Sequence, residues 1–393
     1  MSINGKAYIA GAFEHPTRKA EDKSVALLHA EAAKGALEDA GLSHKDVDGY
    51  FCAGDAPGMG GVALIDYMGL KPRHMDSTET GGSSYIVHVA HAAEAIAAGK
   101  CDVALITLAG RPRSEGHSGA APRTFAANIP EVPFEAPYGP VTVNMYAMAA
   151  MRHMHLYGTT SAQLAWVKVA ASQHAQHNPN AMLREVVTVE EVLASPVIAD
   201  PLHRMDCCVV SDGGGALLVV KPEIAKSLAK TNKRPLVKIL GVGESPKGQN
   251  GGKDLDLTTT GAIWSGPRAF AEAGVKHSDI KYVSIYDSFT ITVVIQLEDL
   301  GFCKKGEGGK FVSDGNLISG VGKLPFNTDG GGLCNNHPAN RGGITKVIEA
   351  VRQLRGEAHP KVQVKNCDIA LAHGTGGSLG SRHGSATLIM ERE

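Results

Sequence analysis

Two stretches of the chain repeat one another: Ala36-Leu-Glu-Asp-Ala-Gly-Leu-Ser-His-Lys-Asp-Val47 and Ala269-Phe-Ala-Glu-Ala-Gly-Val-Lys-His-Ser-Asp-Ile280. A glycine, a histidine and an aspartate of the first copy recur 233 residues later: Gly41, His44 and Asp46 match Gly274, His277 and Asp279. Each copy predicts an amphipathic helix closed by glycine, a short turn and an apolar strand. We expect these strands over Asp48–Ala53 and Tyr282–Asp287.

A second pair of similar segments follows in the same order. Glu94-Ala95-Ile96 resembles Glu349-Ala350-Val351, and the stretch 101–105 resembles 367–371. Helices that alternate with short apolar strands are typical of sheets covered by helices on their faces. We therefore predict an α/β fold of two pseudo-symmetric halves, each with its own sheet, related by a pseudo-twofold axis.

The stretch 111–201 interrupts this repeat. It is rich in Met, His and Tyr, with helical spacing over Tyr146–Tyr157 and Ser161–His177. Loop regions of this length in compact folds usually serve function. We interpret it as an inserted lid or loop subdomain, which leaves an N-terminal half of residues 1–110 plus 202–232 and a C-terminal half of residues 233–393.

Composition narrows the function classes. The 393 residues carry 39 Lys plus Arg against 40 Asp plus Glu, a net charge of −1, so no basic surface for nucleic acid is expected. The seven cysteines form no C-x-x-C pair, so we expect neither a metal site nor a disulfide framework. The sequence shows no secretory leader pattern and no apolar run of membrane-spanning length, and we expect a cytoplasmic protein.

Several motifs resemble the thiolase superfamily, in particular its sterol-carrier-protein thiolase and lipid-transfer-protein branch, over nearly the whole chain. They are Tyr157-Gly-Thr-Thr160, Ile198-Ala-Asp-Pro-Leu202, Ser211-Asp-Gly213, Tyr286-Asp-Ser-Phe289, Asn336-His-Pro338 and Ala372-His-Gly-Thr-Gly-Gly377. The resemblance implies a layered α-β-α-β-α arrangement with four loops that meet at one site. It also implies CoA thioester substrates, no cofactor and a homodimer.

In that family one loop carries a nucleophilic cysteine at a helix start. Counted back from Glu94, this position falls on Gly82, and the 255-residue offset of the second helix pair carries Gly82 onto His337. Acyl-enzyme chemistry with a cysteine is therefore not expected here. Ser83, Ser84 or Cys334 remain as replacements, although we find no dedicated base for the serines.

The remaining loops suit acid–base chemistry. The resemblance assigns catalytic roles to Tyr286, His337 and His373. Backbone N–H groups at a helix start near Gly82 and a glycine turn over 374–377 are expected to bind a thioester oxyanion. The expected substrate-binding residues are Gly82, Ser83, Asp287 and Gly376. Asn336 departs from the family's glycine before His-Pro, which leaves the local backbone shape open.

The first hypothesis is a carbon–carbon lyase that cleaves a β-hydroxyacyl-CoA by a retro-aldol reaction. This is the class of the thiolase-like aldolases of steroid side-chain breakdown, and the resemblance also implies a small partner with an OB-fold and a zinc ribbon. The alternatives are an acyl-CoA C-acyltransferase that works in a complex and a non-catalytic acyl-CoA or lipid binder.

Overall fold

The computed structural model describes residues 2–53, 56–119, 132–248, 256–338, 342–379 and 381–393. Within them a nine-stranded sheet runs in the order β3-β2-β4-β7-β1-β8-β11-β10-β9. Its strands are β1 (Tyr8–Glu14), β2 (Gly49–Phe51), β3 (His74–Asp76), β4 (Val103–Gly110), β7 (Gly213–Val220), β8 (Val237–Lys247), β9 (Tyr282–Ile285), β10 (Ile369–Ser378) and β11 (Ser381–Arg392). The first five strands of this order come from the first repeat and the last four from the second.

The repeated segments form the predicted helix-turn-strand units. Helix α1 (Val25–Ala40) ends at Gly41 with φ 75°, and α9 (Ala262–Ala273) ends at Gly274 with φ 70°. A left-handed residue after a helix favours glycine, which explains why both copies keep it. The following strands, β2 and β9, pair in parallel with β4 and β10, so both units have the same topology.

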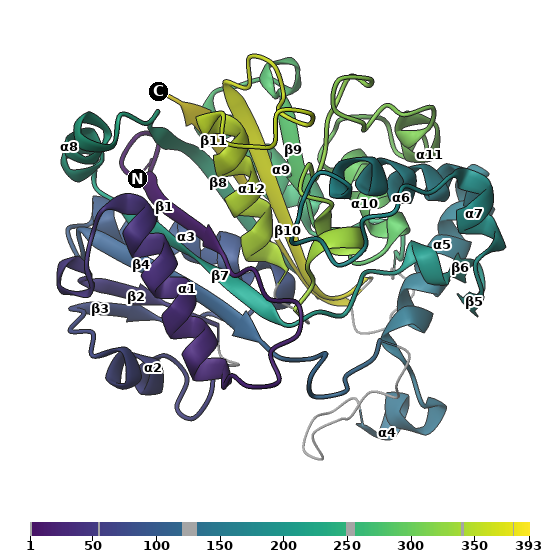
Figure 1. The fold of residues 1–393 in the computed structure, drawn as a ribbon. Helices are drawn as coiled ribbons and strands as arrows, with labels where there is room; N and C mark the ends of the chain where they lie inside the picture. The colour runs from purple at the N-terminus through teal and green to yellow at the C-terminus, as the bar shows by residue number, and fades with distance from the viewer. Residues whose placement is uncertain (1, 54–55, 120–131, 249–255, 339–341, 380) are drawn as a thin grey trace.

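Two helices lie between the halves. Helices α3 (Ser84–Ala97) and α12 (Gly343–Arg355) contact one another, and each contacts strands of both halves. Helix α1 covers the outer face of the first half and α9 that of the second, which gives the predicted five layers (Figure 1). The Ile, Val and Leu side chains of α12 are fully buried, and each stabilises the fold by roughly 1.5–3 kcal/mol.

The expectation of two separate sheets is wrong in one respect. Strand β1 pairs with β8 at two positions, Tyr8 with Lys238 and Ile9 with Val237, so hydrogen bonds join the two half-sheets edge to edge. Edge strands that meet across a pseudo-twofold axis each have unpaired backbone groups, and pairing satisfies them. The sequence pattern predicts the strands but not whether an edge strand of one half pairs with an edge strand of the other.

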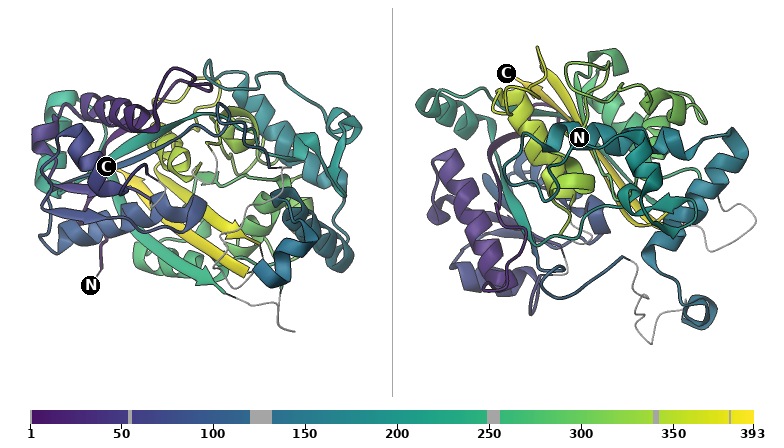
Figure 2. Two further views of the ribbon diagram at one scale, coloured as in Figure 1. Left: turned by 90° about the horizontal axis from the view of Figure 1, so that it is seen from below. Right: turned by 45° about the vertical axis from the view of Figure 1, so that its right-hand side comes forward.

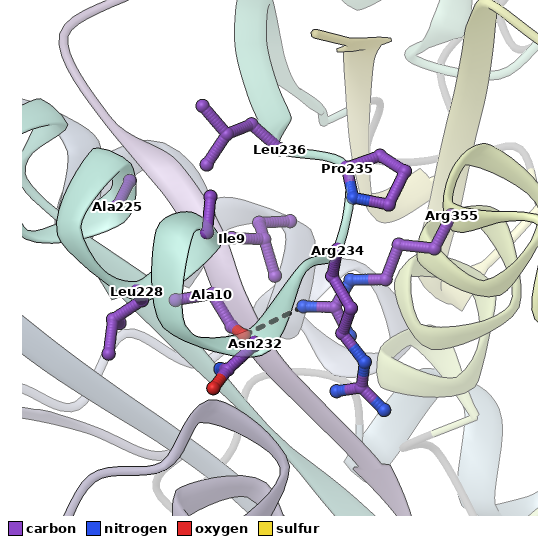
Figure 3. Close-up of a pocket in the computed structure, with 10 residues that line it drawn as sticks. Ile9, Ala10, Ala225, Leu228, Asn232, Arg234, Pro235, Leu236 and Arg355 are labelled. Carbon is purple, nitrogen blue, oxygen red and sulfur yellow. Dashed lines mark hydrogen bonds between the residues drawn. The ribbon is translucent and has the colours of Figure 1, made fainter.

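Ion pairs close the same seam, between α12, α1 and α8 (Pro222–Asn232). Arg355 donates to the carbonyl oxygen of Ala10 at 2.7 Å and to Asp39 at 2.9 Å, while Arg234 donates to Asp39 at 2.6 Å. Figure 3 shows the small hollow that these arginines line together with Ile9, Leu228 and Leu236. Both guanidinium groups are paired with Asp39, so we interpret this hollow as part of the contact between the two halves and not as an active site.

The insertion forms helices on one side of the second half (Figures 1 and 2). They are α4 (Val132–Glu135), α5 (Thr142–Tyr157), α6 (Ser161–Ala175) and α7 (Val189–Ala194), followed by the short pair β5 (Val197–Ala199) and β6 (Leu202–His203). Helices α5 and α6 confirm the helices predicted from spacing, whereas the domain boundaries stay a prediction. In the described ranges no helix is long and apolar enough to cross a bilayer.

Candidate functional site

The starts of the two central helices meet. A 3-10 turn over Gly81–Ser83 precedes α3, and a β-carbon added to Gly343, the first residue of α12, would overlap the carbonyl oxygen of Gly82. Only glycine permits this approach of one backbone to another. The expected meeting of two helix starts is therefore present.

Tyr286 occupies the space beside Gly82. A β-carbon added to Gly82 would lie 2.5 Å from Cε2 and from Cζ of the Tyr286 ring, and it would overlap the carbonyl oxygen of Thr375. Real β-carbons do not approach other atoms this closely, so residue 82 has no room for a thiol side chain. The phenol of Tyr286 stands where the side chain of a nucleophile would project.

His337 lies against Tyr286. Their ring centroids are 5.4 Å apart with the planes at 71°, an edge-to-face contact. His337 is not at the start of α12, as the 255-residue offset suggested, but in the loop six residues before Gly343. Its imidazole reaches back, so that a β-carbon on Gly342 would lie 3.2 Å from its Cδ2.

Asn336 and Ser211 hold the backbone of His337. Ser211 Oγ accepts the His337 N–H at 2.9 Å and donates to Asn336 Oδ1 at 2.7 Å, and Asn336 Nδ2 donates to Glu14 at 3.1 Å. Asn336 has φ −151°, an extended conformation that any residue adopts. The asparagine therefore causes no backbone strain at the position where the family has glycine, and its amide links the loop to β1.

The protonation states of the pair follow from burial. Burial lowers the pKa of His337 to about 4, and its Nε2 has no hydrogen-bond partner among the described residues. Burial, with nearby Cys208 and Tyr146, raises the pKa of the Tyr286 hydroxyl well above its usual value. At neutral pH the site therefore pairs a neutral imidazole, which accepts or donates, with a protonated phenol.

Both carboxylate oxygens of Asp287 accept hydrogen bonds from the protein. Its Oδ1 accepts the N–H of Gly332 at 2.8 Å and the ammonium of Lys346 at 2.8 Å, and its Oδ2 accepts the N–H of Leu333 at 3.1 Å. The side chain is completely buried. Asp287 therefore ties the end of β9 to the loop that carries His337, and its expected substrate contact stays a prediction.

The two serines after Gly82 are also committed. Ser83 Oγ donates to the carbonyl oxygen of Thr80 at 2.8 Å, and Ser84 Oγ accepts the Thr80 N–H at 2.8 Å. Both hydroxyls stabilise the turn that leads into α3. Substrate binding by Ser83 therefore stays a prediction.

The glycine run over 374–377 is part of strand β10 and not a turn. Gly374 pairs with Ala386 and Gly376 with Gly384 of β11. A β-carbon on Gly376 would lie 2.7 Å from the Gly82 nitrogen and would overlap the carbonyl oxygen of Thr80. Gly376 therefore allows the α3 turn to pack against the strand, and its position beside Gly82 agrees with the expected neighbourhood.

His373 lies outside this group. A β-carbon on Gly374 would lie 3.0 Å from the Gly82 carbonyl oxygen, so the side chain of the preceding residue points to the opposite face of β10. There His373 Nδ1 contacts Thr387 Oγ1 at 2.9 Å, which in turn contacts Ser265 of α9. Only its carbonyl oxygen approaches the site, where it accepts the N–H of Tyr286 at 3.0 Å.

Cys334 pairs with a lysine. The ammonium of Lys168 donates to Cys334 Sγ at 3.2 Å and to the carbonyl oxygen of Leu333 at 2.8 Å. Burial raises the pKa of the Cys334 thiol, although Lys168 opposes the shift. A thiol that stays protonated in a closed environment is a poor nucleophile.

Sequence reasoning missed Lys346 and gave no role to Ser211. One signal was available: Lys346, Glu349 and Gln353 recur at helical spacing between the apolar residues of α12. A polar stripe on a helix that is otherwise apolar indicates a buried polar network. The roles of Tyr286 and His337 stay predictions, but the structure brings both residues together with Gly82.

Comparisons with known proteins agree with this geometry. A family model described as "Thiolase C-terminal domain-like" matches residues 243–392. The chain is 34% identical over 397 residues to 17-hydroxy-3-oxo-4-pregnene-20-carboxyl-CoA lyase of Mycobacterium tuberculosis, covering 95% of this chain and 97% of that protein. It is 33% identical over 361 residues to an acetyl-CoA acetyltransferase of Methanothermobacter thermautotrophicus, covering 89% and 91%.

A solved structure titled "Ltp2-ChsH2(DUF35) aldolase" superimposes with a TM-score of 0.87 and 30% identity. The match covers 99% of this chain and 98% of that one. The two halves, the insertion and the loops around Gly82 therefore have their counterparts in known proteins of one fold.

Proposed function

Because this chain belongs to the thiolase superfamily, in its sterol-carrier-protein thiolase and lipid-transfer-protein branch, we propose that it is an acyl-CoA lyase. It cleaves a carbon–carbon bond of a β-hydroxyacyl-CoA by a retro-aldol reaction. The names of its relatives include both a lyase and an acetyltransferase, so relationship alone does not choose between these reactions.

The position of the Tyr286 phenol against Gly82 favours the lyase reaction over acyl transfer. Thiolysis and Claisen condensation by this fold need a nucleophile that holds the acyl group, and residue 82 has no side chain and no space for one. Ser83 and Ser84 are hydrogen-bonded in the turn, and the Cys334 thiol lies on Lys168. A retro-aldol cleavage needs only a base, an acid and a site for the enolate.

The proposed steps use the pair in its neutral states. The β-hydroxyl of the substrate gives its proton to His337 Nε2, and the Cα–Cβ bond breaks as a carbonyl forms at Cβ. The bonding electrons pass into the thioester as an enolate, whose oxygen is stabilised by the N–H groups at the start of α3 and by the Tyr286 hydroxyl. Return of the proton to Cα gives a shortened acyl-CoA and a ketone or aldehyde.

Replacement of either member of the pair tests this assignment. We expect Tyr286→Phe and His337→Gln each to lower kcat for ketone or aldehyde release by about 10²–10⁴-fold, because each removes a proton donor or acceptor. The control is Tyr138→Phe, since Tyr138 is 86% exposed on the insertion. Product would be measured by mass spectrometry with β-hydroxyacyl-CoA thioesters, with the partner subunit present.

The intact protein gives a second measurement. No mass increase is expected after incubation with acyl-CoA, because no covalent intermediate forms. A stable acyl adduct would favour the acyltransferase, and full turnover in both variants would overturn the assignment of the pair. Tight acyl-CoA binding without product from any thioester would favour a non-catalytic binder.

We also propose that the chain works in the cytoplasm as a homodimer with a small OB-fold and zinc-ribbon partner. The related aldolase structure is titled as a complex of two components, which supports a partner. Strand β3 is an edge of the sheet, and Met75 on it is exposed, which supports pairing of two copies there. Light scattering of the chain alone and with its partner distinguishes the two assemblies.

A further inference from the structure

We propose that Lys346 is a positioning residue for His337, acting through Asp287 and through its own fixed positive charge behind the imidazole. The inference rests on the proposed function, in which His337 is the base. Lys346 lies one turn into α12.

The geometry connects three segments through one carboxylate. Lys346 Nζ lies 2.8 Å from Asp287 Oδ1, and the two side chains are 1% and 0% exposed. The carboxylate also accepts the N–H groups of Gly332 and Leu333. Lys346 therefore holds Asp287 between the end of β9, which carries Tyr286, and the loop that carries His337.

The imidazole lies next to this ion pair. A β-carbon on Gly332 would be 3.0 Å from His337 Cδ2 and 3.1 Å from Asp287 Oδ1, so the ring and the carboxylate flank one glycine. A carboxylate this close favours the imidazolium form, and the ammonium opposes it. Lys346, 2.8 Å from Asp287, offsets the effect of this carboxylate on the pKa of His337.

Neighbouring charges shift the pKa values of His337 and Lys346 in known directions. Beyond burial, His337 is affected by Asp287, which raises its pKa, and by Lys346, which lowers it. Burial disfavours the charge on Lys346, but Asp287, Asp329 and Glu14 outweigh it and raise the pKa of Lys346. Lys346 thus stays charged over the working pH range.

Behind Lys346 a larger network neutralises the remaining carboxylates. Arg18 contacts Glu14 at 2.7 Å, and Arg352 contacts Glu14 at 3.1 Å and Glu349 at 3.4 Å. These arginines serve Glu14 and Glu349, and no ion pair in the described residues joins them to Asp287. Loss of Lys346 would therefore leave Asp287 without a cation.

Lys346→Met tests the inference, because it removes the charge and keeps most of the volume. We expect the acid limb of the pH dependence of kcat/KM to move upward by about 1–2 pH units, because an unbalanced carboxylate beside an imidazole raises its pKa by this order. At pH 5 this shift lowers kcat/KM by about 2- to 10-fold relative to the plateau, because a pKa of about 4 becomes about 5–6.

Lys168→Met is the matched control. Lys168 is another almost completely buried lysine, and it contacts the carbonyl oxygen of Leu333 in the same loop but not Asp287. We expect its loss to leave the acid limb at the position of the parent, whatever its effect on the plateau. An equal shift in both variants would show a general loosening of the loop and would overturn the role of Lys346.

A direct titration separates this inference from the proposed function. NMR of protein with ¹⁵N-labelled histidine, with His337→Gln to assign the signal, gives the pKa of His337 without any turnover. A raised pKa in Lys346→Met supports the inference even if no lyase activity is found, and an unchanged pKa overturns it even if the activity is confirmed. Should Lys346→Met not fold, Lys346→Gln makes the same test with a neutral donor to Asp287.

Discussion

Gly82 and Tyr286 fill one volume between them. A β-carbon on Gly82 would overlap the Tyr286 ring and the carbonyl oxygen of Thr375. A side chain at residue 82 and the present position of the Tyr286 ring therefore exclude each other. The absence of a side chain is thus a structural requirement of the phenol's position. A cysteine at residue 82 would need a different place for Tyr286, and the two kinds of chemistry exclude each other at this point.

Gly82→Ala tests that complementarity. We expect a loss of about 1–3 kcal/mol in the free energy of unfolding, because one methyl group must displace a backbone carbonyl or the ring. Displacement of Tyr286 from His337 should also lower product release. Urea denaturation measures the first effect. Gly119→Ala is the control, since a β-carbon there meets nothing within 4 Å; equal losses in the two variants would contradict the crowding at Gly82.

Residue identities at the site were predictable only in part. Tyr286, His337 and Gly82 could be found because they stand in motifs and in the internal repeat. The orientation of His373 could not, because it depends on which face of β10 the α3 turn covers. Lys346 could not be assigned a role, because its partner Asp287 is 59 positions away in sequence.

At the scale of elements, the repeat predicts the helix-turn-strand units but not the strand at 374–377. Three glycines and a threonine in a row are typical of a turn. Here β11 supplies ten residue pairs to β10, and this pairing overrides the local preference. The same glycines let the turn before α3 approach β10. The stretch 374–377 therefore has a low intrinsic preference for a strand, but its glycines are needed for the packing of the site.

A buried carboxylate, that of Glu298, joins the insertion to the second half. Glu298 of α10 (Thr290–Asp299) contacts His153 of α5 at 3.0 Å and Lys305 at 3.1 Å, and it accepts the Gly308 N–H at 2.8 Å. Its side chain and that of His153 are completely buried. The carboxylate thus fixes α5, whose Tyr146 stacks on Phe289 near the site.

Glu298→Ala is expected to lower the free energy of unfolding by about 1–3 kcal/mol, because it leaves the buried His153 ring nitrogen and the Gly308 N–H without their hydrogen-bond acceptor. Amide hydrogen exchange should become faster in α5 before it does in α12. Glu38→Ala is the control, since Glu38 is 67% exposed in its pair with Lys34, and a change below about 0.5 kcal/mol is expected there. A loss in Glu298→Ala no larger than in this control would contradict the anchoring role.

At the scale of the molecule, burial fixes many histidines in the neutral state. Burial is the main cause that lowers the pKa to about 4 for His88, His174 and His337 and to about 3 for His373 and His383. In the unfolded chain each titrates near about 6.5. Between these values the unfolded state binds more protons, so stability is present above pH 6.5 and is lost as pH falls, by about 1.4 kcal/mol per pH unit for each group.

His91 and Glu349 act in the opposite sense. Asp76, at 2.5 Å, raises the pKa of His91 to about 10, so the stability from this pair is complete below about pH 6.5 and falls as pH rises. Burial raises the pKa of Glu349 to about 7, which favours the folded state at lower pH. Below pH 6.5 the five neutral histidines outweigh Glu349, so the free energy of unfolding falls as the pH falls. Above pH 6.5 His91 contributes to the loss of stability as the pH rises.

We therefore expect the urea midpoint to be highest near pH 7 and lower at both pH 5 and pH 8. His91→Gln should reduce but not remove the loss between pH 7 and pH 8, because the unfolded thiols, whose pKa is about 8.5 and is raised by burial in the folded state, begin to ionise there too. The variant should leave the fall toward pH 5 in place. His88→Gln should reduce the fall toward pH 5, because it removes one of the five neutral histidines. A midpoint at pH 5 equal to or above that at pH 7 would mean that these imidazoles become protonated without unfolding, and the closed packing around His337 would then not hold in solution.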